Sequence, residues 1–237
     1  KLSETDAGVN ISVNYEYHGI LSTGSIVYLI LGDGSITVNH SFNTDNDSLP
    51  NIPKLGLSLQ IPSEFDNMTW FGRGPHESYF DRKGSTRVDL YSGKVADQYH
   101  PYIRPQENGN KTDVRWASFQ NKQGFGLLVS GLMSLNASHF ILDDYDHGLS
   151  KSKDSGATGN IKTTKQQLHS IDMVPRDLIN LDIDYRQMGV GGEDSWWAQP
   201  LMKYQIKPGN YQYGFTMIPL LPDSELLKIS KNIYLKN

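Results

Sequence analysis

The sequence predicts an all-β fold, and three observations support this prediction. Apolar and polar residues alternate in several separate stretches, most clearly at 8–17 and 179–185, as expected of strands with one buried face. Glycine turns such as Gly32-Asp-Gly34 separate these stretches, which is typical of hairpins. No convincing helical pattern of ten residues and no repeat of fixed period is visible. We therefore expect two large, mainly antiparallel sheets packed face to face, with a dozen or more strands.

The expected strands follow from the same alternation, taken in order along the chain. They lie at 8–17, 26–31, 35–42, 55–61, 114–119, 124–129, 134–141 and 179–185. A closing hairpin is expected from 201–206 and 211–217 around the Pro208-Gly-Asn210 turn. Residues 70–113 are weakly periodic and too long for a simple connector, which indicates a functional or interface loop system with short strands inside it. We expect one domain over 1–222, with 223–237 as an extra strand, a tail or a linker.

Composition excludes several classes of function. The 237 residues are 37% hydrophobic, 20% charged and 11% aromatic, which is typical of a globular chain. The net charge is −4 and the basic residues are scattered, so we expect neither nucleic acid nor a membrane as a partner. Cysteine is absent, which excludes disulfides and thiolate metal sites. The first residues carry no signal pattern, so we expect an N-terminus cut inside a longer protein, with N-terminal strands of the domain possible outside it.

The stretch Met188-Gly-Val-Gly-Gly-Glu-Asp-Ser-Trp-Trp197 is the main candidate for a binding loop. Its three glycines permit a sharply bent backbone directly after the predicted strand at 179–185. Two carboxylates and two indoles follow within five positions. Carboxylates accept hydrogen bonds from hydroxyls, and an indole offers a flat apolar face. The combination suits a sugar, although tryptophan is also a common core residue. The candidate side chains in this loop are those of Glu193, Asp194, Trp196 and Trp197.

Three motifs give the chain a resemblance to a known family. Residues 70–81 read Trp-Phe-Gly-Arg-Gly-Pro-His-Glu-Ser-Tyr-Phe-Asp, 99–109 read Tyr-His-Pro-Tyr-Ile-Arg-Pro-Gln-Glu-Asn-Gly, and 188–196 read Met-Gly-Val-Gly-Gly-Glu-Asp-Ser-Trp. In order and spacing they resemble the C-terminal domain of the large β-galactosidases of glycoside hydrolase family 2. The resemblance extends from about residue 55 to 220. It implies a β-supersandwich, galactose mutarotase-like, as the last domain of a bacterial multidomain enzyme of carbohydrate metabolism, in the cytoplasm or the periplasm.

The resemblance also implies that catalysis and this chain's contribution to sugar binding belong to different domains of the parent enzyme. Retaining glycosidases use two carboxyl groups about 5 Å apart, and in this family both belong to Glu residues of a TIM barrel that this sequence does not contain. We therefore expect no hydrolysis from this chain alone. The family places the tryptophan after Asp-Ser in the mouth of the active site, and that residue is Trp196 here. Trp197 is expected either to pack inward or to widen the same platform.

Two further candidates lie in the second motif. Glu107 and Asn108 are expected either to bind sugar hydroxyls in a concavity of the sheet or to form a turn, in which Glu107 bonds to the backbone or to Arg104. In the first motif, Glu77 and Arg73 are expected to form an internal ion pair. The histidines show no metal-ligand spacing, so we expect no metal and no cofactor. The expected partners are a β-galactoside or another carbohydrate and the other domains of the parent enzyme.

Two other functions stay open at this point. One is a stand-alone sugar epimerase of the mutarotase type, which would need a general acid and a general base beside the sugar ring. The other is a purely carbohydrate-binding or structural module. The three motifs favour the β-galactosidase domain over both.

Overall fold

The computed structural model describes residues 1–5, 8–103, 105–145, 169–193 and 198–234. Within these residues the chain is almost entirely β-structure, and every strand pairing is antiparallel, so the predicted fold class is confirmed. The strands are β1 (Leu2–Thr5), β2 (Gly8–Tyr17), β3 (Ser22–Leu31), β4 (Ile36–Asn43), β5 (Lys54–Ile61), β6 (Asn67–Gly74), β7 (Arg87–Lys94), β8 (Lys111–Gln120), β9 (Gly126–Ser138), β10 (Ile179–Gln187) and β11 (Tyr211–Leu220).

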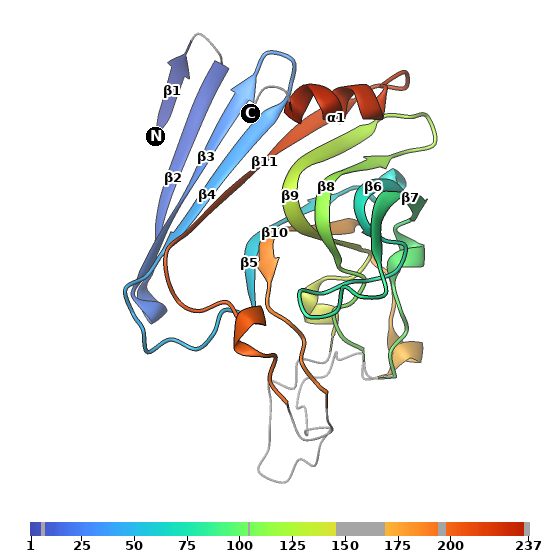
Figure 1. The fold of residues 1–237 in the computed structure, drawn as a ribbon. Coiled ribbons are helices and arrows are strands. Elements are labelled where there is room, and N and C mark those ends of the chain that lie inside the picture. The colour runs from blue at the N-terminus through green and yellow to red at the C-terminus, as the bar shows by residue number, and fades with distance from the viewer. Residues whose placement is uncertain (6–7, 104, 146–168, 194–197, 235–237) are drawn as a thin grey trace.

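The strands are joined into one hydrogen-bonded network with two arms. The main path runs β1-β2-β3-β4-β11-β9-β8-β6-β7, and β10 lies between β9 and β5. Strand β9 makes the branch, because residues 126–130 pair with β11 and residues 134–138 pair with β10. Figure 1 shows the result: β1 to β4 and β11 extend as one arm, while β5 to β10 curve into the other. The glycine loop leaves the curved arm at the end of β10.

The main core lies against the curved arm. Ile179, Leu181 and Ile183 alternate along β10 and are fully buried, in one cluster with Trp70 and Phe119. This confirms the alternation seen in the sequence. The polar residues Asp182 and Asp184 between them are also shielded from solvent. Asp182 and Asp184 retain only 7% and 2% of their exposure.

Two predicted elements differ from the structure. Residues 201–206 form no strand of a closing hairpin; they contain a 3-10 helix, and β11 pairs with β4 and β9 instead. The predicted strands at 124–129 and 134–141 are one continuous strand, β9. In both places the periodicity is short, and tertiary pairing decides the outcome.

Helices are few and short among the described residues. The segment 223–237 contains the α-helix α1 (Leu226–Tyr234), where Leu226 and Ile229 pack against Trp116, Leu128 and Leu220. Its nine residues are too few for a clear helical pattern in the sequence. The 3-10 helices are η1 (His18–Ile20), η2 (Ser63–Phe65), η3 (Ala96–Gln98), η4 (Leu142–Asp144), η5 (Ser170–Asp172) and η6 (Met202–Tyr204). None of the described helices is long and apolar enough to cross a membrane.

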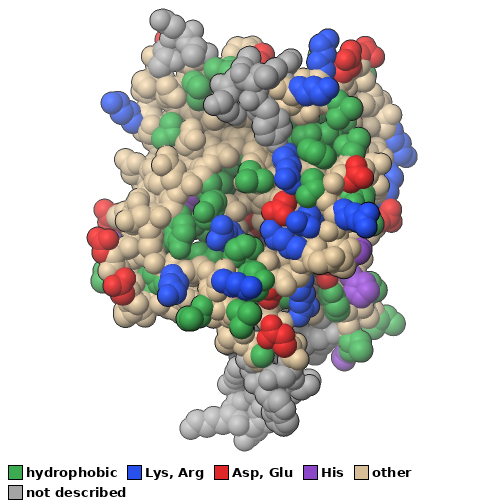
Figure 2. All heavy atoms as spheres, viewed as in Figure 1, with side chains coloured by type: hydrophobic (Ala, Val, Ile, Leu, Met, Phe, Trp, Pro, Cys, Tyr) green, Lys and Arg blue, Asp and Glu red, His purple; other side chains and the backbone are tan. Residues whose placement is uncertain are grey.

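On the face drawn in Figure 2, the charges agree with the charge balance of the sequence. Figure 2 shows basic and acidic side chains interspersed with apolar ones on one face of the molecule. This distribution differs from the single-sign basic patch that is typical of a nucleic-acid interface.

Candidate functional site

The glycine loop after β10 is closed at its neck by the backbone. The amide of Gly192 donates to the carbonyl of Ala198 at 2.9 Å, so the two ends of the segment 193–197, which we call the tip of the loop, are joined at the neck. Gly191 and Gly192 have φ values of 60° and 74°, a region that side chains disfavour. A Cβ on Gly191 would lie 2.5 Å from the Ala198 oxygen. Glycine is therefore required at this position by both conformation and space.

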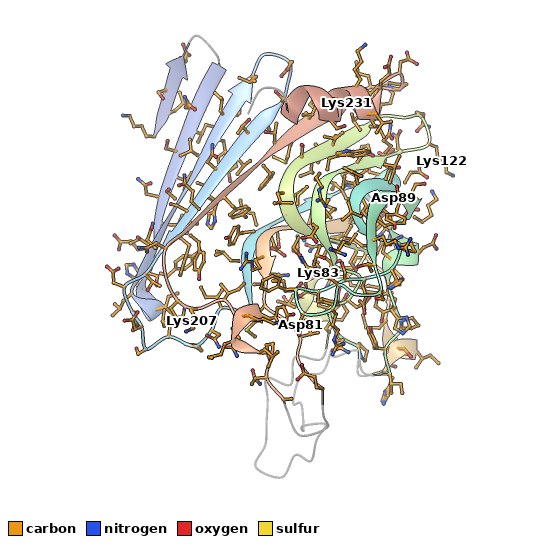
Figure 3. All side chains as sticks on the ribbon, in the orientation of Figure 1. Asp81, Lys83, Asp89, Lys122, Lys207 and Lys231 are labelled. Carbon is orange, nitrogen blue, oxygen red and sulfur yellow. The ribbon has the colours of Figure 1, made fainter. Side chains whose placement is uncertain are left out.

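The first motif holds the neck from the side. Asp81 accepts hydrogen bonds from the amides of Val190 at 3.0 Å and Gly191 at 2.8 Å, one with each carboxylate oxygen. Its neighbour Arg82 donates from Nη2 to the carbonyl of Gly191 at 2.5 Å. Figure 3 shows Asp81 beside the chain that follows β10. The loop is therefore fixed by charged side chains of a segment more than a hundred residues away in sequence.

Contacts on both flanks complete the support of the loop. The amide of Met188 donates to Pro53 O and that of Gly189 donates to Tyr204 O, both at 2.8 Å. The ring of Phe80 lies between the two flanks, with the Arg186 guanidinium 4.5 Å from its centre and the Tyr204 ring at 5.3 Å. Segment 201–206, predicted as a strand, serves instead as the outer support of the glycine loop.

The predicted residues of the tip are only partly described. Glu193 is exposed, at the point where the chain leaves the neck. Asp194, Trp196 and Trp197 lie outside the described residues. The structure thus gives the support of the loop, and the roles of its tip stay predictions.

Glu107 and Asn108 have different surroundings. The Asn108 side chain is 3% exposed; its oxygen accepts from the His100 amide at 2.8 Å, and its nitrogen donates to Gln106 O at 3.0 Å. Both polar groups thus have backbone partners within the second motif. Glu107 instead reaches across to β5, where Lys54 Nζ donates to its Oε1 at 2.9 Å. Its alternative partner, Arg104, lies outside the described residues.

Lys54 connects a group of acids on the inner side of the curved arm. Its Nζ lies 2.9 Å from both Glu107 Oε1 and Asp182 Oδ2. Burial alone would lower the pKa of Lys54, but the charges of Glu107 and Asp182 outweigh burial and raise it. Burial raises the pKa of Asp184 well above its usual value, against the opposing charge of Lys54. This combination keeps Lys54 charged and favours the protonated form of Asp184.

Glu77 links the first two motifs. Its carboxylate accepts from the hydroxyls of Tyr79 and Tyr102, and from the Gly109 amide at 2.8 Å. The hydrogen bond to Glu77, followed by burial, raises the pKa of Tyr102 to about 12. The predicted ion pair between Glu77 and Arg73 is wrong, because Arg73 Nε donates to Asp113 at 2.5 Å. Position 77 turns its side chain toward the second motif, which the spacing in the sequence did not indicate.

Sequence reasoning missed three kinds of residue at this end of the molecule. Arg82 lies just beyond the first motif, and nothing near it in sequence indicates the glycine loop. Lys54 is the first residue of β5, where a lysine reads as a solvated strand end. Asp182 and Asn136 occupy polar positions of alternating strands, which normally face water. The available signal was a strand with only Asn and Asp on one face and only apolar residues on the other.

The described residues contain no group of three His, Cys, Asp or Glu side chains that could hold a metal ion. Glu107 and Asp182, beside Lys54, accept from ammonium and hydroxyl donors.

Comparison with known proteins places these features in a family. Residues 1–217 match the family described as β-galactosidase small chain. A β-galactosidase from Priestia megaterium is 37% identical over 218 residues, covering 90% of this chain and 19% of that protein. One from Pseudoalteromonas haloplanktis is 32% identical over 217 residues, covering 91% and 18%. The chain thus spans about a fifth of the length of these relatives.

Solved structures of two other proteins align with most of this chain. A putative aldose 1-epimerase from Escherichia coli K12 gives a TM-score of 0.40 at 9% identity, covering 92% of this chain and 66% of that one. A GalM/aldose epimerase homologue from C. elegans gives 0.39 at 9% identity, covering 92% and 67%. The sequence match extends over nearly the whole chain and includes all three motifs described above. The chain belongs to the β-galactosidase small chain family.

Proposed function

We propose that this chain is a C-terminal, non-catalytic domain of a β-galactosidase, and that its glycine loop places Trp196 beside the bound galactoside. The observation that carries the proposal is the doubly fixed neck of the loop: Asp81 and Arg82 hold Gly191 from both its amide and its carbonyl. A loop with only a structural role would not need a neck fixed so firmly, whereas a binding loop gains affinity from being ordered in advance.

The chemistry of hydrolysis is assigned to other parts of the parent enzyme. A retaining glycosidase needs an acid/base and a nucleophile about 5 Å apart on either side of the glycosidic bond. In this proposal both belong to a TIM barrel of the parent enzyme, and the relatives have about four fifths of their length outside the region matched here. In this proposal the chain contributes to substrate binding and packs on those other domains.

Trp196 would act through its indole face. The C–H face of a galactose ring is apolar, and stacking against an indole contributes about 1 kcal/mol beyond the area buried. Glu193 and Asp194, at the same tip, would accept hydrogen bonds from sugar hydroxyls. The contact stabilises the sugar in the correct position and takes no part in bond breaking. Loss of the contact should therefore lower kcat/KM.

The test substitutes Trp196 in the parent enzyme, assembled with its catalytic domains. We expect Trp196→Ala to lower kcat/KM for lactose or for an aryl galactoside by about tenfold or more, equivalent to about 1.4 kcal/mol. Trp197→Ala is the matched control because it removes an identical side chain from the next position. Circular dichroism and gel filtration confirm that each variant folds and assembles.

The outcomes separate the alternatives. Loss of activity only in Trp196→Ala supports the proposal and identifies which indole contacts the sugar. Equal losses in both variants would indicate a platform of two tryptophans. Unchanged kinetics in a folded Trp196→Ala enzyme would contradict the proposal and leave the domain with a structural role.

A further inference from the structure

A cavity of about 280 Å³ lies on the inner side of the curved arm. Its floor is the polar face of three adjacent strands, β5, β10 and β9. Glu107 and the chain at 140–145 form its walls. The volume lies near the lower end of the range for small-molecule sites, which corresponds to a ligand of monosaccharide size.

The floor is built by strand register. Asp182 on β10 lies opposite Ser58 on β5 and Asn136 on β9, so these three side chains form one row. Asn180 lies opposite Gln60 and Ser138 in the next row. All six side chains line the cavity, and the apolar residues between them face the core on the other side. The cavity is thus a consequence of three strands that carry polar residues in matching register.

Three charged groups of the cavity, those of Lys54, Glu107 and Asp182, hold one another in position. Asp182 accepts from Ser58 Oγ through Oδ1 and from Lys54 Nζ through Oδ2, the latter at 2.9 Å. Glu107 shares the same ammonium group at 2.9 Å. Two carboxylates therefore face one ammonium, an arrangement that repels an anion such as a phosphate and accepts hydroxyl donors.

One polar atom of the floor has no partner among the described residues. The Asn136 side chain is 4% exposed, and its nitrogen donates to Asn108 O at 2.9 Å. Its oxygen, Oδ1, is buried without a donor. A buried carbonyl oxygen in this state needs an explanation, and a ligand hydroxyl is one that fits a polar cavity.

We propose that this cavity binds a neutral, hydroxyl-rich ligand of the size of one monosaccharide unit. Its hydroxyls donate to Asn136 Oδ1 and to the carboxylates of Glu107 and Asp182, while Lys54 donates to a ring or hydroxyl oxygen. Ile141 and Leu142 at the wall cover an apolar C–H face. This site rests on the cavity alone and does not require the proposed role of Trp196.

The position of the cavity connects it to the glycine loop. Lys54 lies opposite Gln187, the last residue of β10 and the one before Met188. The Pro53 carbonyl, next to Lys54, accepts from the Met188 amide at 2.8 Å. A ligand that contacts Lys54 therefore binds beside the strand end that supports the loop.

The test is isothermal titration of the parent protein with D-galactose and D-glucose, in a Trp196→Ala background that weakens binding at the glycine loop. Glu107→Gln and Asp182→Asn each remove a charged acceptor, and we expect either one to weaken the remaining binding by about tenfold or more. Ser58→Val narrows the floor of the cavity without changing its charge, and it should also weaken binding. It takes the place of Asp182→Asn in the test if that variant fails to fold.

Matched controls lie outside the cavity. Glu64→Gln changes an exposed glutamate that accepts from Asn121. Asp177→Asn changes an aspartate that accepts from Ser63, as Asp182 does from Ser58. Both should leave binding unchanged. Equal sugar affinity in the cavity variants and in the controls would overturn the proposal. Failure of both D-galactose and D-glucose to bind would also overturn it. Binding of D-galactosamine but not of the neutral sugars would overturn the assignment of a neutral ligand.

Discussion

The carboxylate of Asp81 spans two successive amides of the glycine loop, those of Val190 and Gly191, at 3.0 and 2.8 Å. Such hydrogen bonds to a charged acceptor are stronger than those between neutral groups. Through these bonds the first motif supports the loop that carries Trp196, although the two segments are more than a hundred residues apart in sequence. Positions in the first motif should therefore affect sugar binding without contacting the sugar.

We predict that Asp81→Ala in the assembled enzyme lowers kcat/KM toward the value of Trp196→Ala. Loss of two charge-assisted hydrogen bonds frees the neck, so the tip no longer holds its position. A double-mutant cycle with Trp196→Ala measures the coupling, and the double variant should be little worse than either single one. The control is Asp89→Asn, an exposed aspartate on β7 that bonds to the amide of Leu90. Additive losses would show that Asp81 acts independently of Trp196.

Gly191→Ala should distort the neck directly. The residue has φ 60° and lacks room for a Cβ beside Ala198 O, so we expect a loss of about 1–2 kcal/mol in the free energy of unfolding, with reduced kcat/KM. Gly84→Ala is the control because a Cβ there meets nothing within 4 Å. Urea unfolding and steady-state kinetics of both variants give the comparison. A Gly191→Ala enzyme with normal stability would mean that the neck relaxes without cost.

The sequence predicted the fold class because alternation is a local property that burial preserves. The row Ile179, Leu181, Ile183 shows this, since each residue is fully buried as the pattern indicates. The candidate site was predicted only in part. The glycine loop has a local signal, but its clamp by Asp81 and Arg82 depends on contacts between distant segments, which no periodicity contains. The cavity was missed for a similar reason: the polar face of β10 is the floor of a cavity walled by Glu107 and the chain at 140–145, and these segments are distant from β10 in sequence.

Glu77→Gln should destabilise the junction between the first two motifs. The carboxylate accepts from two tyrosine hydroxyls and one backbone amide, and the neutral amide replaces one acceptor oxygen with a donor. We expect a loss of about 1–3 kcal/mol in the free energy of unfolding, measured in urea. Glu64→Gln, at an exposed position, should change it by less than about 0.5 kcal/mol. Equal stability of the two variants would show that the tyrosine hydroxyls find other partners.

Lys111 should make stability depend on pH in the alkaline range. Its side chain is 1% exposed, and burial lowers its pKa from 10.5 to about 8, although the Glu77 charge acts in the opposite direction. Below pH 8 both the folded and the unfolded chain bind the proton, so the cost of the buried charge is constant. Between about pH 8 and 10.5 the unfolded chain holds more protons than the folded one, and stability therefore rises with pH.

Comparison with Lys111→Met isolates this effect from other titrating groups. Between pH 7.5 and 9.5 the original chain should gain about 2 kcal/mol in the free energy of unfolding relative to the variant, as the shift in pKa requires. Lys122→Met, at an exposed turn between β8 and β9, is the control and should show no such difference. Urea titrations at the two pH values give all three curves. A parallel response of the original chain and Lys111→Met would mean that Lys111 stays charged inside the fold, held by Gly109 O at 3.0 Å and by the Trp70 ring at 5.4 Å.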